Sequence, residues 1–131
     1  MHVQLTLNTP RRVCFTDITH HIKQAVNDSG IAEGTALVFV PHTTAGVTIN
    51  ENGDPNVLKD LEFALERAVP NTGFHHFEGN SDSHTKTLLT GPSLSLIITG
   101  GRLVLGTWQS VYLAEYDGPR HRNVHIKIME G

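Results

Sequence analysis

Strict alternation of apolar and polar side chains marks both ends of the chain. Residues 3–7 alternate in this way, and residues 123–129 do the same. A period of two is typical of a strand with one face buried. After the break at Thr9-Pro10, residues 11–15 are expected to return alongside the first strand.

The middle of the chain contains further strand patterns. Residues 35–40 form a near-continuous apolar run, which predicts a strand covered on both faces. Residues 46–50 resume in strand, and residues 93–99 lead into the two-residue hairpin signal Gly100-Gly101. With returning strands at 102–106 and 108–116, the C-terminal third is expected to form an antiparallel meander.

Helical spacing of apolar residues appears between these strands. A helix over residues 18–29 is expected to be capped by Asp17 and ended by Gly30. A second, over residues 55–68, has Asp54 as its cap and carries a buried stripe. Ser83 is expected to cap a short helix over residues 84–89. The pattern predicts one β-rich α+β domain over residues 1–131, with two packed sheets and helices at one side.

Composition excludes several classes of protein. A net charge of -3 over 131 residues argues against nucleic acid and anionic membranes as partners, because phosphate binding favours an excess of Lys and Arg. No apolar run is long enough for a signal peptide or a membrane span. The one cysteine, Cys14, excludes an internal disulfide and fits a reducing, cytoplasmic compartment.

Nine histidines are the unusual feature of the composition. Three of them, His42, His75 and His84, sit where the chain turns or where a helix is expected to start. A catalytic zinc commonly takes three protein ligands and keeps one position open, so these imidazoles meet that number. Their spacing matches no local metal motif. The alternative is that each is a surface or hydrogen-bonded loop histidine, and both interpretations stay open.

Carboxylates lie close to these histidines in the sequence. Glu51 follows the segment that begins at His42, whereas Asp54 is fully explained as a helix cap. Glu78 and Asp82 lie between the two later histidines. A carboxylate beside a metal-bound water can act as a general base or orient a ligating imidazole. Glu51 is therefore the carboxylate with no evident structural role.

Basic groups provide a second candidate chemistry, the binding of anions. Lys86 lies near an expected helix start, and Arg120 and Arg122 share one turn. Arginine is suited to bidentate phosphate contacts. The alternative is a solvated turn in which both arginines pair with nearby carboxylates. Further along the last third, Trp108 is expected in the core, and Gln109 is expected to be a buried carboxamide that needs partners.

Several motifs together resemble one known family. They are His42-Thr43-Thr44-Ala45, residues 50–55, residues 75–80, His84-Thr85-Lys86, Gly106-Thr107-Trp108-Gln109 and residues 115–120. In this order they are similar to the YjbQ-like family, also described as a secondary thiamine-phosphate synthase family. The resemblance covers almost the whole chain. It implies a jelly-roll-like β-sandwich with flanking helices, assembled as a homotrimer.

The resemblance also implies a function and a set of site residues. The reaction joins hydroxymethylpyrimidine diphosphate to a thiazole phosphate and releases pyrophosphate. The roles implied are metal ligation by His42, His75 (or His76) and His84; catalysis by Glu51, Gln109 and Lys86; and contacts to a small phosphorylated substrate by Thr43, Thr44, Asn50, Asn80 and Arg120 (or Arg122). Three imidazoles suit zinc or another transition metal better than Mg²⁺. The alternatives are a non-catalytic trimer that binds a metal or a small phosphate ligand, and an enzyme with a different substrate.

Overall fold

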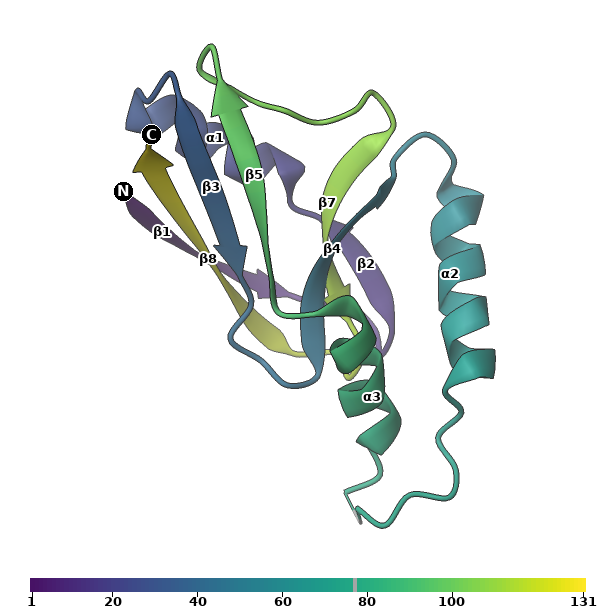
Figure 1. The fold of residues 1–131 in the computed structure, drawn as a ribbon. Coiled ribbons are helices and arrows are strands. Elements are labelled where there is room, and N and C mark those ends of the chain that lie inside the picture. Colours follow the sequence, from purple (N-terminus) through teal and green to yellow (C-terminus); the bar gives the residue numbers. More distant parts are fainter. Residues whose placement is uncertain (77) are drawn as a thin grey trace.

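The described part of the chain folds into two antiparallel sheets and three helices. The computed structural model describes residues 1–76 and 78–131, which form eight strands. The larger sheet has the order β1-β8-β3-β5-β6 and the smaller has the order β2-β7-β4 (Figure 1). The strands are β1 (His2–Asn8), β2 (Cys14–Asp17), β3 (Gly34–Phe39), β4 (Ala45–Glu51), β5 (Ser93–Thr99), β6 (Arg102–Leu103), β7 (Gln109–Glu115) and β8 (His121–Glu130). The predicted strand-rich α+β fold is therefore confirmed.

The core lies between the two sheets and helix α1 (Thr19–Ser29). The helix buries Ile22, Ala25 and Val26, as its apolar spacing predicts. The Asp17 carboxylate accepts the backbone N–H of Thr19 at 2.9 Å, which serves one of the unpaired N–H groups at the helix start. At the other end, Gly30 adopts a left-handed φ of 69°, a conformation that favours glycine. The predicted end at Gly30 is confirmed, whereas the helix starts one residue later than predicted, at Thr19, with Ile18 rather than Asp17 in the cap position.

Helix α2 (Pro55–Ala68) is covered less than its sequence predicts. Its start is confirmed, since Asp54 caps it by accepting the Asn56 N–H at 2.9 Å. No residue of the helix is fully buried, however, and the predicted apolar stripe is only half-covered at Leu58, Leu61 and Leu65. Phe63, off that stripe, is 62% exposed. The predicted buried stripe was therefore wrong in extent, because the helix packs at the side of the smaller sheet (Figure 1).

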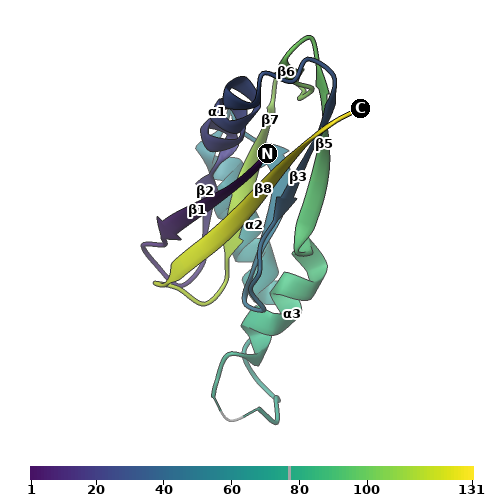
Figure 2. The same ribbon diagram turned by 90° about the vertical axis from the view of Figure 1, so that its left-hand side faces the viewer.

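Helix α3 (Ser81–Thr90) begins three residues before the predicted start at His84. Asn80, rather than Ser83, occupies the cap position. His84 consequently lies within the helix instead of at its first turn. The helix extends beyond one end of the sheets (Figures 1 and 2). The turn between β5 and β6 lies at the opposite end, together with α1.

Strand pairing differs from the sequence expectation in two places. Strand β2 does not return along β1: β1 pairs with β8, and β2 pairs with β7 in the other sheet. The C-terminal third is not a meander, because β7 leaves the larger sheet for the smaller one. The outer face of β3 is also less covered than predicted, with Phe39 42% exposed. Alternation identifies the buried face of a strand but not its partner, which explains the wrong pairings.

The helices of the described chain have 10 to 14 residues each. None of those within residues 1–76 and 78–131 is long and apolar enough to cross a bilayer. The longest, α2, has 14 residues, against the roughly 20 that a spanning helix needs.

Candidate functional site

A polar pocket of about 360 Å³ lies where three segments meet. The connection from β3 to β4 forms one wall, the connection from β7 into β8 forms another, and the start of α3 forms the third. The lining residues are Pro41, His42, Thr43, Thr44, Glu78, Asn80, His84, Asp117, Arg120 and Arg122. Six of the residues predicted for the site are therefore brought together: His42, Thr43, Thr44, Asn80, His84 and Arg120.

A buried ion pair between Arg122 and Glu115 forms the base of the pocket. Both side chains are almost completely buried. The Glu115 carboxylate accepts hydrogen bonds from the Arg122 guanidinium, from the Thr9 hydroxyl at 2.8 Å and from the Asp117 N–H at 2.8 Å. Burial alone would raise the pKa of Glu115, but these donors outweigh it and hold the pKa below its usual range. Both groups are therefore charged at neutral pH and form an ion pair with each other.

The tautomer of His42 is fixed by the backbone of β8. Its Nε2 accepts the N–H of Asn123 at 2.9 Å. A neutral imidazole that accepts at Nε2 carries its proton on Nδ1. Burial and the neighbouring Arg122 charge lower the pKa of His42, so the ring is neutral near pH 7. His42 therefore offers the pocket an N–H donor without a charge.

Arg120 provides the accessible cation of the pocket. Its Nε donates to the Asp117 carbonyl at 2.8 Å and its Nη2 donates to the Asp117 carboxylate at 2.9 Å. A guanidinium has five N–H donors, so donors remain for a ligand. The side chain is 51% exposed, in contrast to the buried Arg122. Of the two arginines that the sequence offered for phosphate, Arg120 is the available one.

Asn80 contributes an acceptor to the same pocket. Its Nδ2 donates to the Asp117 carboxylate at 2.8 Å, which orients the amide. The Oδ1 is buried, and within residues 1–76 and 78–131 it has no hydrogen-bond partner. A buried acceptor without a donor is costly. The pocket therefore combines donors at His42 and Arg120 with an unmet acceptor at Asn80.

A second ion network holds α3, which carries His84 of the pocket. Lys86 is completely buried, and its ammonium donates to Asp82 at 3.2 Å and to Glu66 at 2.8 Å. The Arg12 guanidinium contacts both oxygens of Asp82, at 2.9 and 3.1 Å. Lys86 was predicted to act in catalysis, but it lies in this network and not in the pocket lining. Its structural effect is to fix the helix that presents His84.

The three predicted metal ligands do not meet. His75 is exposed and does not line the pocket, whereas the ring of His76 lies edge-on to that of His84 with centroids 5.7 Å apart. Across the part of the chain that the structure describes, no group of three or more His, Cys, Asp or Glu side chains could hold a metal ion. His42 Nε2 is also already engaged by Asn123. The described residues of one chain thus do not fit a three-histidine centre, and the metal stays a prediction from the resemblance.

Three other predicted site residues lie where β4 ends and β7 begins. Glu51 pairs with Gln109 across β4 and β7, and Asn50 precedes Glu51 in the strand. Gln109 is exposed rather than buried, and its Oε1 accepts the Gly106 N–H at 2.8 Å. Trp108 is 66% exposed, so its predicted place in the core was wrong. Its ring lies so close to Gly53 that a Cβ there would come within 2.7 Å of it.

Sequence reasoning missed the importance of Glu115 and Asp117, which hold the two arginines in place. These two are the nearby carboxylates with which the arginines were expected to pair if the turn were only a solvated one. For Arg122 that alternative was wrong, because its pairing with Glu115 is buried. A signal was present: Glu115 continues the inward positions of β7 after Val111 and Leu113. A charged residue at an inward strand position predicts a buried partner.

Comparison with known proteins places the chain in a family. The family model described as UPF0047 protein YjbQ-like matches residues 3–131. The chain belongs to this family. It is 47% identical to a UPF0047 protein of Methanocaldococcus jannaschii, over 94% of this chain and 90% of that protein. It is 43% identical to the UPF0047 protein YugU of Bacillus subtilis, over 95% of this chain and 96% of YugU.

Solved structures give the same relationship. A protein of the YjbQ/UPF0047 family from Clostridium acetobutylicum, described as uncharacterized, superposes with a TM-score of 0.95 at 48% identity, covering 97% of this chain and 99% of that one. A YbjQ-like protein of unknown function from Sulfolobus solfataricus gives a TM-score of 0.96 at 29% identity, covering 100% and 97%. The fold is therefore shared across bacterial and archaeal relatives.

Proposed function

We propose that the protein binds a small phosphorylated molecule in the pocket between His42, His84 and Arg120. The observation that carries this proposal is the convergence of fixed donors on one pocket from separate segments. Arg120 supplies a charged guanidinium with donors to spare, and His42 supplies a neutral N–H. Charge-assisted hydrogen bonds from arginine to phosphate are among the stronger ones in proteins.

The surrounding groups fit this ligand class. Thr43 and Thr44 add hydroxyls to the pocket lining. The charge of Arg122 is neutralised by Glu115, so this arginine needs no anion from a ligand. Asn80 Oδ1 would accept a hydrogen bond from a hydroxyl or amino group on the organic part of the ligand. A volume of about 360 Å³ accommodates a small metabolite rather than a macromolecule.

Isothermal titration calorimetry with pyrophosphate tests this proposal. We expect saturable binding to the native chain and a loss of about tenfold or more in Arg120→Gln, the size of one charge-assisted hydrogen bond. Arg67→Gln is the matched control, because Arg67 is a surface arginine that lies over Phe63 on α2. Equal affinity in the native and Arg120→Gln proteins would refute the assignment.

Thiamine-phosphate synthesis remains the more specific proposal, and it rests on the family resemblance. Both substrates of that reaction are phosphorylated, so the pocket would hold one of them. Pyrophosphate release from the two substrates, measured in the native protein and in Arg120→Gln and Glu51→Gln, tests it. Saturable release lost in Arg120→Gln would support it, and binding without release would leave the protein a phosphate-ligand binder.

The assembly and the cellular location are proposed on the same basis. We propose a homotrimer of jelly-roll-like sandwiches in the cytoplasm. Helix α2 has no fully buried residue, and Phe63 is largely exposed, which supports further coverage by another copy. If the untagged chain sediments with the mass of a monomer, the proposed trimer is refuted.

A further inference from the structure

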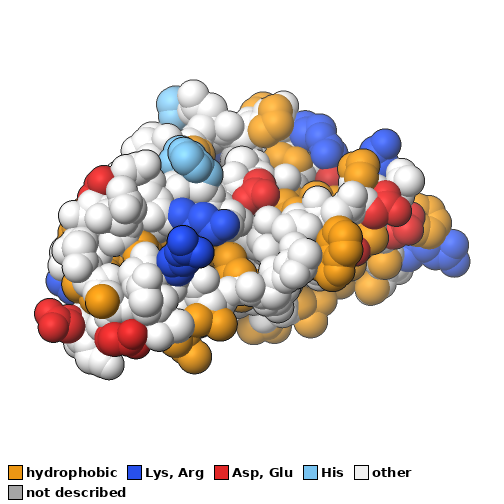
Figure 3. Space-filling view, turned by 90° about the horizontal axis from the view of Figure 1, so that it is seen from above, with side chains coloured by type: hydrophobic (Ala, Val, Ile, Leu, Met, Phe, Trp, Pro, Cys, Tyr) orange, Lys and Arg blue, Asp and Glu red, His pale blue; other side chains and the backbone are white. Residues whose placement is uncertain are grey.

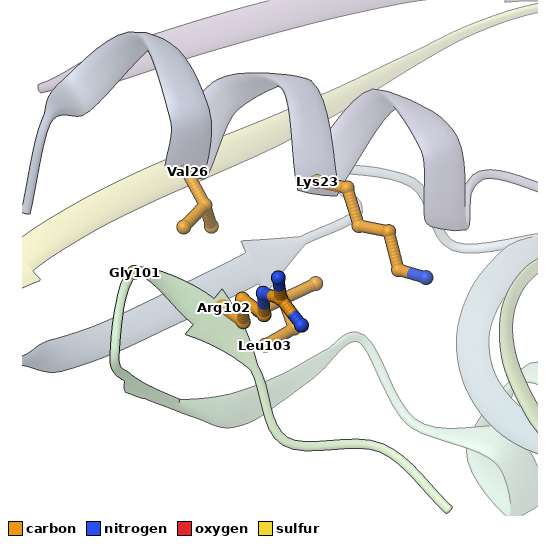
Figure 4. Close-up of a pocket in the computed structure, with 5 residues that line it drawn as sticks. All are labelled: Lys23, Val26, Gly101, Arg102 and Leu103. Atoms are coloured by element: carbon orange, nitrogen blue, oxygen red, sulfur yellow. The ribbon is translucent and has the colours of Figure 1, made fainter. Parts of the chain in front are cut away.

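A second groove lies at the opposite end of the fold from the polar pocket. Helix α1 and the β5–β6 turn form it, with a volume of about 370 Å³. The lining residues are Lys23, Val26, Gly101, Arg102 and Leu103. Figure 4 shows the Arg102 guanidinium in the space between β6 and the helix, with Lys23 on the helix above it. Two cations therefore border one groove.

Neither cation has a protein partner. Within residues 1–76 and 78–131, Lys23 and Arg102 form no ion pair and no side-chain hydrogen bond. The other arginines of the described chain all contact a carboxylate or an aromatic ring, at Glu62, Asp82, Phe63, Asp117 and Glu115. Arg102 is thus the exception among them. Seen from this end, basic side chains gather near the centre of the face (Figure 3).

Two carboxylates of the surrounding segments, Asp28 on α1 and Glu33 beside the β5–β6 turn, are engaged elsewhere. Glu33 accepts the Thr99 hydroxyl at 3.0 Å and the Gly100 N–H at 3.1 Å. Asp28 accepts the Gln24 amide at 2.8 Å. Neither Glu33 nor Asp28 forms an ion pair with Lys23 or Arg102. The groove therefore keeps two positive charges that an external anion can neutralise.

The wall that carries Arg102 is held in place. The Glu33 contacts pin the β5–β6 turn, and the Gly101 N–H donates to the Ala32 carbonyl at 3.0 Å. The groove is lined on its inner side by Val26, which is buried, and by the half-buried Leu103. The site thus combines a pre-formed wall, an apolar inner surface and two free cations. Pre-formed sites lose less freedom on binding.

We propose that this groove binds a phosphate monoester with an apolar body. The phosphate would bridge Lys23 and Arg102, and the apolar part would lie on Val26 and Leu103. A phosphate monoester carries a charge of about -1.5 to -2 near pH 7, which matches two cations better than a single carboxylate does. The site is separate from the pocket around Arg120 and does not depend on its function.

Titration with phenyl phosphate, followed by the amide signals in a two-dimensional ¹H–¹⁵N NMR spectrum, tests the proposal. We expect saturable shifts at Val26, Gly101 and Leu103. Arg102→Gln should weaken this binding about tenfold or more, since it removes a charge-assisted contact. Inorganic phosphate should bind more weakly than phenyl phosphate, because it lacks the apolar part.

Matched variants separate this site from the first pocket. Lys127→Gln removes an exposed lysine outside the groove and should leave the affinity unchanged. Arg120→Gln should likewise leave the shifts at Val26 and Leu103 intact. Absence of saturable shifts at the groove, equal affinity in Arg102→Gln, or equal affinity for inorganic and phenyl phosphate would each overturn the proposal.

Discussion

Lys86→Met is predicted to destabilise the protein rather than to remove a ligand contact. The ammonium is completely buried and bridges Asp82 of α3 to Glu66 of α2. Breaking a buried ion pair by removing one partner costs about 3–5 kcal/mol. Asp82 keeps its contacts to Arg12, so we expect the lower end, about 3 kcal/mol. Methionine fills similar volume, so the loss reports the charge rather than a cavity.

Urea unfolding at one fixed protein concentration measures this change. We expect a lower midpoint with an unchanged slope, the signature of lost stability. Lys59→Met on α2 is the matched control, because Lys59 is exposed and its replacement should stay within about 0.5 kcal/mol of the native chain. Asp82→Asn and the double variant complete a cycle in which the two effects should be strongly non-additive. Native stability together with lost pyrophosphate binding in Lys86→Met would refute this reasoning.

Three further predictions follow from the contacts. The pKa values of Asp82 and Glu115 are both lowered despite burial. The stability that these carboxylates add is therefore complete above the usual carboxyl pKa of about 4, and it is lost as the pH falls through the lowered values. Unfolding measured between pH 7 and pH 3 should show this loss, and a Glu115→Gln protein should show a smaller loss. His42→Gln should keep more stability than His42→Phe, because only the amide can still accept the Asn123 N–H, and thermal unfolding compares the two. Elemental analysis of untagged protein should find the same metal content in the native chain and in His42→Gln. If the native chain held about one metal ion and His42→Gln lost it, the assigned tautomer of His42 would be contradicted.

The sequence predicted the elements better than their arrangement. The ends of α1 and the start of α2 could be predicted from local signals, because Asp17, Gly30 and Asp54 make their contacts within a few residues along the chain. Pairing of β2 with β7 joins residues far apart in the chain, and alternation carries no information about such partners. The two wrong pairings share this cause.

The site was predictable to the extent that its residues lie in short motifs. His42, Thr43 and Arg120 were named from such motifs and do line one pocket. The buried position of Lys86 was not predictable, because one of its carboxylate partners, Glu66, lies on another helix. Arg12, which contacts its other partner Asp82, comes from a distant segment of the chain. Glu51 follows the His42 segment closely in sequence, yet it lies at the far end of β4, where it pairs with Gln109 of β7.

The most direct test of the account is a long-range ¹H–¹⁵N NMR spectrum of the imidazoles during a titration with inorganic phosphate. Before phosphate is added, His42 should show the tautomer with its proton on Nδ1, since Nε2 accepts from Asn123. On titration, the signals of His42 and His84 should move together and saturate, and Arg120→Gln should suppress the movement. His42 and His84 signals that stay unmoved, or a His42 proton on Nε2, would contradict the proposed pocket.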